Sequence, residues 1–124
     1  MENKALEILK TMARELPGLT AAAVVHLEDG LSIAEVSTRD DVDAGAASAY
    51  LASIVQSNLQ AVKVLAADQI THDILITTDK NYFLIRHFPR QPFFLFVMTE
   101  KDEWLGRARL IMKTFERLLI KALA

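Results

Sequence analysis

The chain has 124 residues, the usual length of one domain, and it can bury a core without disulfides or metal. It contains no cysteine, which excludes a disulfide scaffold, a cysteine zinc site and a thiol nucleophile. Fourteen basic and sixteen acidic residues give a net charge of −2; this balance predicts no nucleic-acid partner and gives no indication of binding to an anionic membrane.

The distribution of apolar residues predicts a cytoplasmic protein. Residues 1–16 alternate charged with apolar side chains and lack the apolar core of a signal peptide. No apolar run approaches the roughly 20 residues that a membrane helix needs, so no membrane span is expected. The mean hydropathy of +0.20 is nevertheless high for a short chain, which indicates that a partner covers part of the surface.

The first half of the chain predicts a helix followed by a hairpin. Apolar residues at three- and four-residue steps predict a helix that ends at Pro17-Gly18. The apolar residues 19–27 predict a central strand that is covered on both faces, and residues 31–36 predict its return strand. Asp29-Gly30 between them predicts a type I′ turn, which needs positive φ at both central positions.

Residues 44–65 predict a long helix, with Asp41 or Asp43 as its N-cap. One apolar stripe is expected to lie on the sheet: Ala47, Leu51, Ile54, Val55, Leu59 and Val62. A second stripe holds mostly small or neutral residues: Ala46, Tyr50, Ser53, Ser57, Gln60 and Val64. Lys63 is the only charged residue in the helix, whereas a solvated helix face normally carries several charges. We therefore expect the second stripe to be a contact surface.

The second half predicts three strands and a helix. Alternating residues from Ile70 to Thr77 predict an edge strand, residues 82–88 run back, and the apolar residues 93–98 predict a buried central strand. The last helix is expected to be capped near Asp102. Its expected apolar face comprises Trp104, Leu105, Ala108, Ile111, Met112, Phe115, Leu118, Leu119 and Ala122. The order α-β-β-α-β-β-β-α predicts an α+β domain, with helices on both faces of a five-stranded antiparallel sheet.

No motif predicts catalysis, and we expect neither an enzyme nor a cofactor. Gly18, Gly30, Gly45 and Gly106 form no phosphate-binding loop, and no serine lies in a nucleophile elbow. The three histidines, 26, 72 and 87, fall on three predicted strands, where structural roles are favoured over a metal site. The acidic residues at 28–29 and 40–43 are expected at turns and helix starts rather than around a cation.

Several short segments resemble the Roadblock family. Leu16-Pro17-Gly18-Leu19, an Ala/Val strand and the run from Asp29-Gly30 to Ala34 resemble its opening. Residues 78–85 resemble the hairpin between its third and fourth strands, and residues 104–109 resemble the entry into its last helix. The family includes dynein light chains, lysosomal scaffold subunits and bacterial gliding-motility regulators of a Ras-like GTPase.

The resemblance implies one Roadblock-like domain over residues 1–124, a profilin-like three-layer α/β/α sandwich. Its second helix covers one face of the sheet, and its first and last helices cover the other. It also implies a homodimer, joined through helix 44–65 and strand 69–78, that serves as a scaffold or regulator for a small Ras-like GTPase. The expected interface residues are Ala46, Tyr50, Ser53, Ser57, Gln60, Ile70, His72 and Ile74. No arginine can be assigned as an arginine finger, so activation of hydrolysis and simple tethering both stay open.

The alternative is a small-molecule sensor or a general protein-interaction module of similar sandwich fold. Phe93, Phe94 and Phe96 would line a cavity in a sensor, although phenylalanines of a central strand ordinarily fill a core. A hydrolase ranks third, because only scattered serines and histidines favour it.

Overall fold

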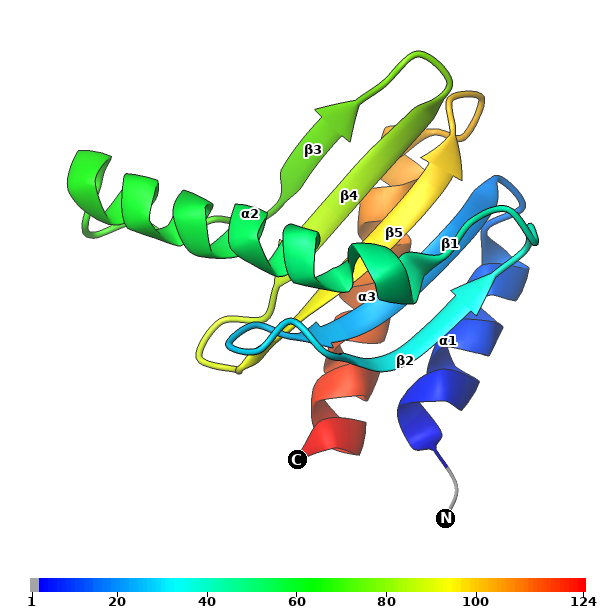
Figure 1. Ribbon diagram of the computed structural model, residues 1–124, viewed down its shortest axis with the longest axis horizontal. Helices are drawn as coiled ribbons and strands as arrows, with labels where there is room; N and C mark the ends of the chain where they lie inside the picture. Colours follow the sequence, from blue (N-terminus) through cyan, green and yellow to red (C-terminus); the bar gives the residue numbers. More distant parts are fainter. Residues whose placement is uncertain (1–2) are drawn as a thin grey trace.

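The computed structural model describes residues 3–124 and has the element order that the sequence predicts. The elements are α1 (Lys4–Glu15), β1 (Leu19–His26), β2 (Ser32–Ser37), α2 (Ala44–Leu65), β3 (Ile74–Thr77), β4 (Asn81–His87), β5 (Phe93–Glu100) and α3 (Leu105–Leu123). The five strands form one antiparallel sheet in the order β2-β1-β5-β4-β3 (Figure 1). Helix α2 crosses one face of the sheet, and α1 and α3 cover the other. The predicted three-layer sandwich, with β3 at an edge, is confirmed.

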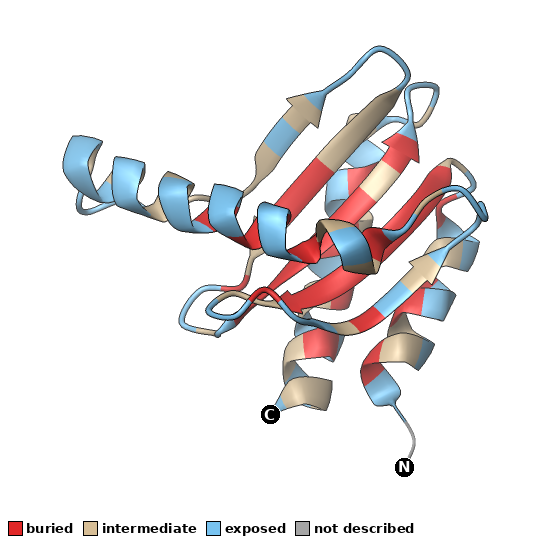
Figure 2. Ribbon diagram, viewed as in Figure 1, coloured by how far each residue is buried: buried red, intermediate tan, exposed pale blue. Residues whose placement is uncertain are grey.

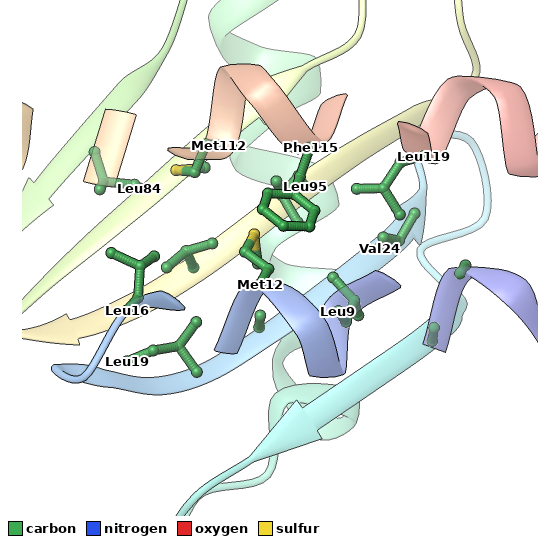
Figure 3. Packing of buried hydrophobic residues seen from close by; sticks show 14 of the residues in the cluster. Leu9, Met12, Leu16, Leu19, Val24, Leu84, Leu95, Met112, Phe115 and Leu119 are labelled. Carbon is green, nitrogen blue, oxygen red and sulfur yellow. The ribbon is translucent and has the colours of Figure 1, made fainter. Parts of the chain in front are cut away.

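Two hydrophobic clusters hold the layers together. The larger one lies under α1 and α3, where Met12 and Phe115 meet Val24 and Leu95 of the central strands (Figure 3). The smaller one lies under α2, where Leu51 and Val55 pack on the opposite face of the same strands. Because β1 and β5 contribute side chains to both clusters, they are buried on both faces, as their apolar runs predict.

The hairpin between β1 and β2 forms, but its predicted type I′ turn is wrong. Gly30 has a φ of 72°, whereas Asp29 has no positive φ. The backbone N–H of Gly30 donates to the His26 carbonyl at 3.0 Å, and the Leu31 N–H donates to Asp29 Oδ1 at 3.0 Å. The Asp29 side chain thus stabilises an Asx turn within a loop over residues 27–31, which is longer than a two-residue turn.

The two aspartates considered as caps of α2 have different roles. Asp43 is the N-cap, and its Oδ1 accepts the Ala46 N–H at 3.0 Å. Asp41 instead accepts two hydrogen bonds from the Arg39 guanidinium, at 2.9 and 2.7 Å. These hydrogen bonds lower the pKa of Asp41 from its usual value.

Strand β3 is shorter than the predicted strand over residues 69–78. It covers Ile74–Thr77, so Ile70 and His72 lie in the segment that precedes it. The ladder between β3 and β4 begins at Ile74 and Ile85. Beyond this pair, the His72 carbonyl accepts a hydrogen bond from the Arg86 side chain at 3.3 Å. A side-chain contact therefore replaces the next step of the ladder.

The start of α3 also differs from the prediction. Asp102 does not cap the helix, because the N-cap position is Trp104, which makes no side-chain capping bond. Trp104 has an extended backbone with φ −72° and ψ 121°, and its side chain is exposed. The helical stripe cannot extend to a residue outside the helix, which is why Trp104 does not join the core.

One ion pair fastens α3 to the sheet. Arg86 Nε of β4 lies 3.0 Å from Glu116 Oε1 of α3, and the two side chains are only 18% and 16% exposed.

Among residues 3–124, no helix is both long enough and apolar enough to cross a membrane.

We expect Glu116→Ala to lower the free energy of unfolding by about 2 kcal/mol, because it leaves the half-buried Arg86 guanidinium unpaired. Urea denaturation measures the loss. The matched control is Asp41→Ala, which breaks the exposed pair with Arg39 and should leave the denaturation midpoint unchanged. Equal midpoints for wild type and Glu116→Ala would show that the Arg86–Glu116 pair does not stabilise the fold.

Candidate functional site

Helix α2 extends beyond the sheet on which it packs. Its buried residues are Ala44, Ser48, Leu51, Ala52 and Val55, and none lies beyond Val55. The C-terminal half projects past β3 and is mostly exposed (Figures 1 and 2). Val64 and Leu65 at its end are each 84% exposed. This half of the helix therefore has little of the tertiary packing that normally stabilises helices in proteins.

The C-terminal half of α2 that projects past β3, here called the overhang, makes the inner face of the helix differ from the predicted stripe. Of the predicted stripe, Leu51 and Val55 are buried, Ala47, Leu59 and Val62 are half-buried, and Ile54 is exposed. Ser48 and Ala52 lie at the sheet instead, and Ser48 Oγ donates to the Ala44 carbonyl at 3.0 Å. Leu59 still packs against the cluster under α2, but no residue beyond Val55 is buried because the end of the helix extends past the sheet.

The outer face of α2 is exposed and uncharged. The predicted contact residues are all exposed: Ala46, Tyr50, Ser53, Ser57 and Gln60. Lys63 remains the only charged residue in the 22-residue helix. Charged residues are depleted at the cores of protein interfaces, whereas solvated helix faces are rich in them. The outer face of α2 therefore lacks the charges of a normal solvated helix face, and its role as an interface stays a prediction.

Strand β3 supplies a second surface beside α2. Within the described residues it pairs only with β4, so its other edge presents free backbone donors and acceptors. Ile74 is half-buried and packs towards the cluster under α2. Ile70 and His72 are in the segment that precedes β3. Ile70 is exposed, and it lies near the end of α2 because Ile70 and Lys63 of α2 line the same hollow. The participation of these three residues in an interface stays a prediction.

The hollow beside α2 was not predicted from the sequence. It has a volume of about 460 Å³, and it lies between the end of α2, the segment before β3 and the β4–β5 turn. Its cationic groups are Lys63 and Arg90, with His87 alongside. The lining of the hollow comes from three separate segments, so no local pattern in the sequence marks these residues as neighbours.

The aromatic run proposed to line a sensor cavity lies in the core instead. Phe94 and Phe96 are buried under α2, and Phe93 is buried on the opposite face of the sheet. None of the three lines the hollow beside α2. The phenylalanines therefore fill the two clusters, which is the usual role of such residues in a central strand.

The histidines do not form a common site. The His26 ring lies 5.3 Å from the Phe93 ring, and His87 Nε2 lies 2.9 Å from the Gln91 carbonyl oxygen. His72 lies before β3 rather than on a strand. Within residues 3–124, no three histidine or carboxylate side chains are grouped closely enough to hold a metal ion.

No protein-family model matches the sequence, and no curated protein matches it. Solved structures, in contrast, match nearly the whole chain. The Roadblock/LC7 domain from Streptomyces avermitilis has a TM-score of 0.84 at 13% identity, over 95% of this chain and 96% of that one. Myxococcus xanthus MglB has a TM-score of 0.86 at 15% identity, over 97% and 87%. The gliding protein MglB from Thermus thermophilus has a TM-score of 0.74 at 17% identity, over 96% and 87%.

Proposed function

Because the chain has the Roadblock/LC7 fold, we propose that it is a cytoplasmic, non-enzymatic homodimer that scaffolds or regulates a small Ras-like GTPase. The observation that carries this proposal is the exposed, uncharged outer face of α2 beside the unpaired edge of β3. The two surfaces are adjacent, so one partner can cover both.

A second copy of the chain is the partner that suits this pair of surfaces. Two β3 edges that pair with each other satisfy the free backbone groups on both sides. Such pairing would also bring the α2 helices of the two copies side by side, so that their outer stripes, which include Ser57 and Val64, would cover each other. The resemblance implies the same use of helix 44–65 and strand 69–78. One similar structure is described as MglB with a tetrameric arrangement.

A small GTPase is the proposed client of the dimer. The support is the resemblance of the sequence motifs to a family that includes regulators of Ras-like GTPases, together with the likeness to MglB. The chain itself lacks a phosphate-binding glycine loop, so the proposed role is to bind the GTPase rather than the nucleotide.

We expect the immobilised protein to retain a P-loop GTPase from the lysate of its source, identified by its peptides. The capture is run in parallel with GDP and with a non-hydrolysable GTP analogue. Retention only with the analogue would indicate a regulator that reads the nucleotide state. Equal retention in both arms would indicate a scaffold, because a ligand that does not discriminate between two states cannot report on them. A dimer that retains no GTPase in either arm would contradict the proposed client.

A further inference from the structure

Helix α3 carries most of the exposed positive charge of the helices. It contains five basic residues and one acidic residue: Arg107, Arg109, Lys113, Arg117, Lys121 and Glu116. The last four basic residues recur every four positions, and this spacing places them along one side of the helix. All five basic residues are exposed.

The single acidic residue of α3 does not offset this charge at the surface. Glu116 is turned towards β4, where Arg86 pairs with it, and it is largely buried. Arg109 pairs with Asp73 at 2.9 Å. Lys113, Arg117 and Lys121 make no salt bridge with any of residues 3–124. The part of α3 that carries Lys113, Arg117 and Lys121 is therefore cationic, whereas Arg109 is paired with Asp73.

Apolar side chains lie among these cations. Leu110 is 65% exposed and Leu118 is 48% exposed, both on the same helix. A shallow groove between α1 and α3 is lined by Ile8, Leu118 and Ala122, and its charged residues are Lys4, Lys121 and Glu7. A helix face that combines lysines and arginines with exposed leucines is typical of segments that lie on membrane surfaces.

The charges of residues 4–123 are separated by layer. The α1 and α3 layer contains eight basic and three acidic residues. Residues 16–104, which form the sheet, α2 and the loops, contain six basic and twelve acidic residues. The formal net charge of −2 therefore hides a strongly positive layer on the side of the sheet opposite α2.

We propose that the outer face of the α1 and α3 layer binds the surface of a membrane that contains anionic phospholipids. Lysine and arginine side chains would contact the headgroups, and Leu110 and Leu118 would enter the interface between headgroups and acyl chains. This geometry depends on the proposed dimer in one respect. Pairing through β3 places both copies of α3 on the same side of a continuous sheet, so that two cationic helices face one plane and bind it bivalently.

The test measures sedimentation of the full chain with phosphatidylcholine vesicles, with and without phosphatidylglycerol. We expect binding only to the anionic vesicles, and weaker binding as salt shortens the Debye length. The double variant K113E/R117E should bind at least about tenfold more weakly, because two headgroup contacts become repulsive. The matched control is K80E/K101E, which changes the net charge equally at exposed positions outside the helices and should bind like wild type. Melting curves confirm that both variants are folded.

A Leu110→Ser variant tests whether the face binds a lipid surface or any polyanion. It should bind anionic vesicles several-fold more weakly but should bind duplex DNA like wild type, because contacts between basic side chains and phosphates do not bury the leucine. The proposal is overturned if the wild-type protein does not bind anionic vesicles. It is also overturned if the control variant loses as much binding as K113E/R117E. Tighter binding to duplex DNA than to the vesicles would also overturn it and would assign the face to nucleic acid.

The same assay distinguishes this proposal from the proposed dimer. The molecular mass is measured in parallel by light scattering. A monomeric wild type that still binds anionic vesicles through Lys113 and Arg117 would contradict the dimer and leave the membrane-binding face intact. A dimer with no affinity for the vesicles would contradict only the membrane-binding face.

Discussion

The Ser57→Arg variant is expected to have half the molecular mass of the wild-type protein in solution. Wild type should scatter light as a species of twice its 13.9 kDa chain mass. Ser57 is exposed on the uncharged outer face of α2, which forms the proposed interface. Each arginine would be buried without a partner in a symmetric contact, and an unpaired buried charge costs several kcal/mol. Light scattering at micromolar concentration measures the change.

The matched control places the same residue on the other side of the sheet. Thr114→Arg adds an arginine at an exposed position of α3, outside the proposed interface, and should leave the mass of the dimer unchanged. If Ser57→Arg keeps the wild-type mass, the interface does not include this part of α2. If wild type has the mass of one chain, the proposed dimer is wrong.

The Gly30→Val variant is expected to lose about 3 kcal/mol or more in the free energy of unfolding. Gly30 has a φ of 72°, a conformation that costs a β-branched residue about 1–3 kcal/mol. In addition, a Cβ at this position would lie 2.8 Å from Ala49 Cα in the backbone of α2. The helix cannot move away without disturbing Leu51 and Val55, which pack on the sheet. Urea denaturation measures the loss.

Gly106 provides the control for this variant. It lies in α3 with nothing within 4 Å of the position of a Cβ. Gly106→Ala should therefore raise the stability by up to about 1 kcal/mol, because alanine has the higher helix propensity. Similar unfolding midpoints for Gly30→Val and wild type would mean that the hairpin loop rearranges freely away from α2.

Local patterns in the sequence predicted most of the fold. The bounds of α2 were predicted correctly because Asp43 caps it and its residues show two continuous stripes. The buried character of β1 and β5 followed from their apolar runs. The length of β3 did not follow, because alternation continues through residues 70–73, where the Arg86 side chain bonds the His72 carbonyl in place of a strand. Such a contact joins distant residues and leaves no periodic signal.

Of the two candidate surfaces, one could be predicted from the sequence and the other could not. The uncharged outer face of α2 could be recognised because its residues recur on one side of one helix. The cationic face of α3 was missed, because net charge sums over the molecule and does not describe its distribution. The inward position of Glu116 depends on Arg86, thirty residues away in the sequence, and only the folded structure shows that this carboxylate is neutralised.

The overhang of α2 has a consequence for hydrogen exchange. In a single chain, the amides of residues 56–65 can open by fraying from the helix end, since none of these residues is buried. In the proposed dimer a second copy would cover this part of the helix, so the same amides would exchange only after dissociation or unfolding and their protection would increase with protein concentration. Amides of β1 and β5 in the buried sheet would instead report the stability of the fold. One hydrogen-exchange experiment would therefore measure association from the amides of residues 56–65 and the stability of the fold from the amides of β1 and β5.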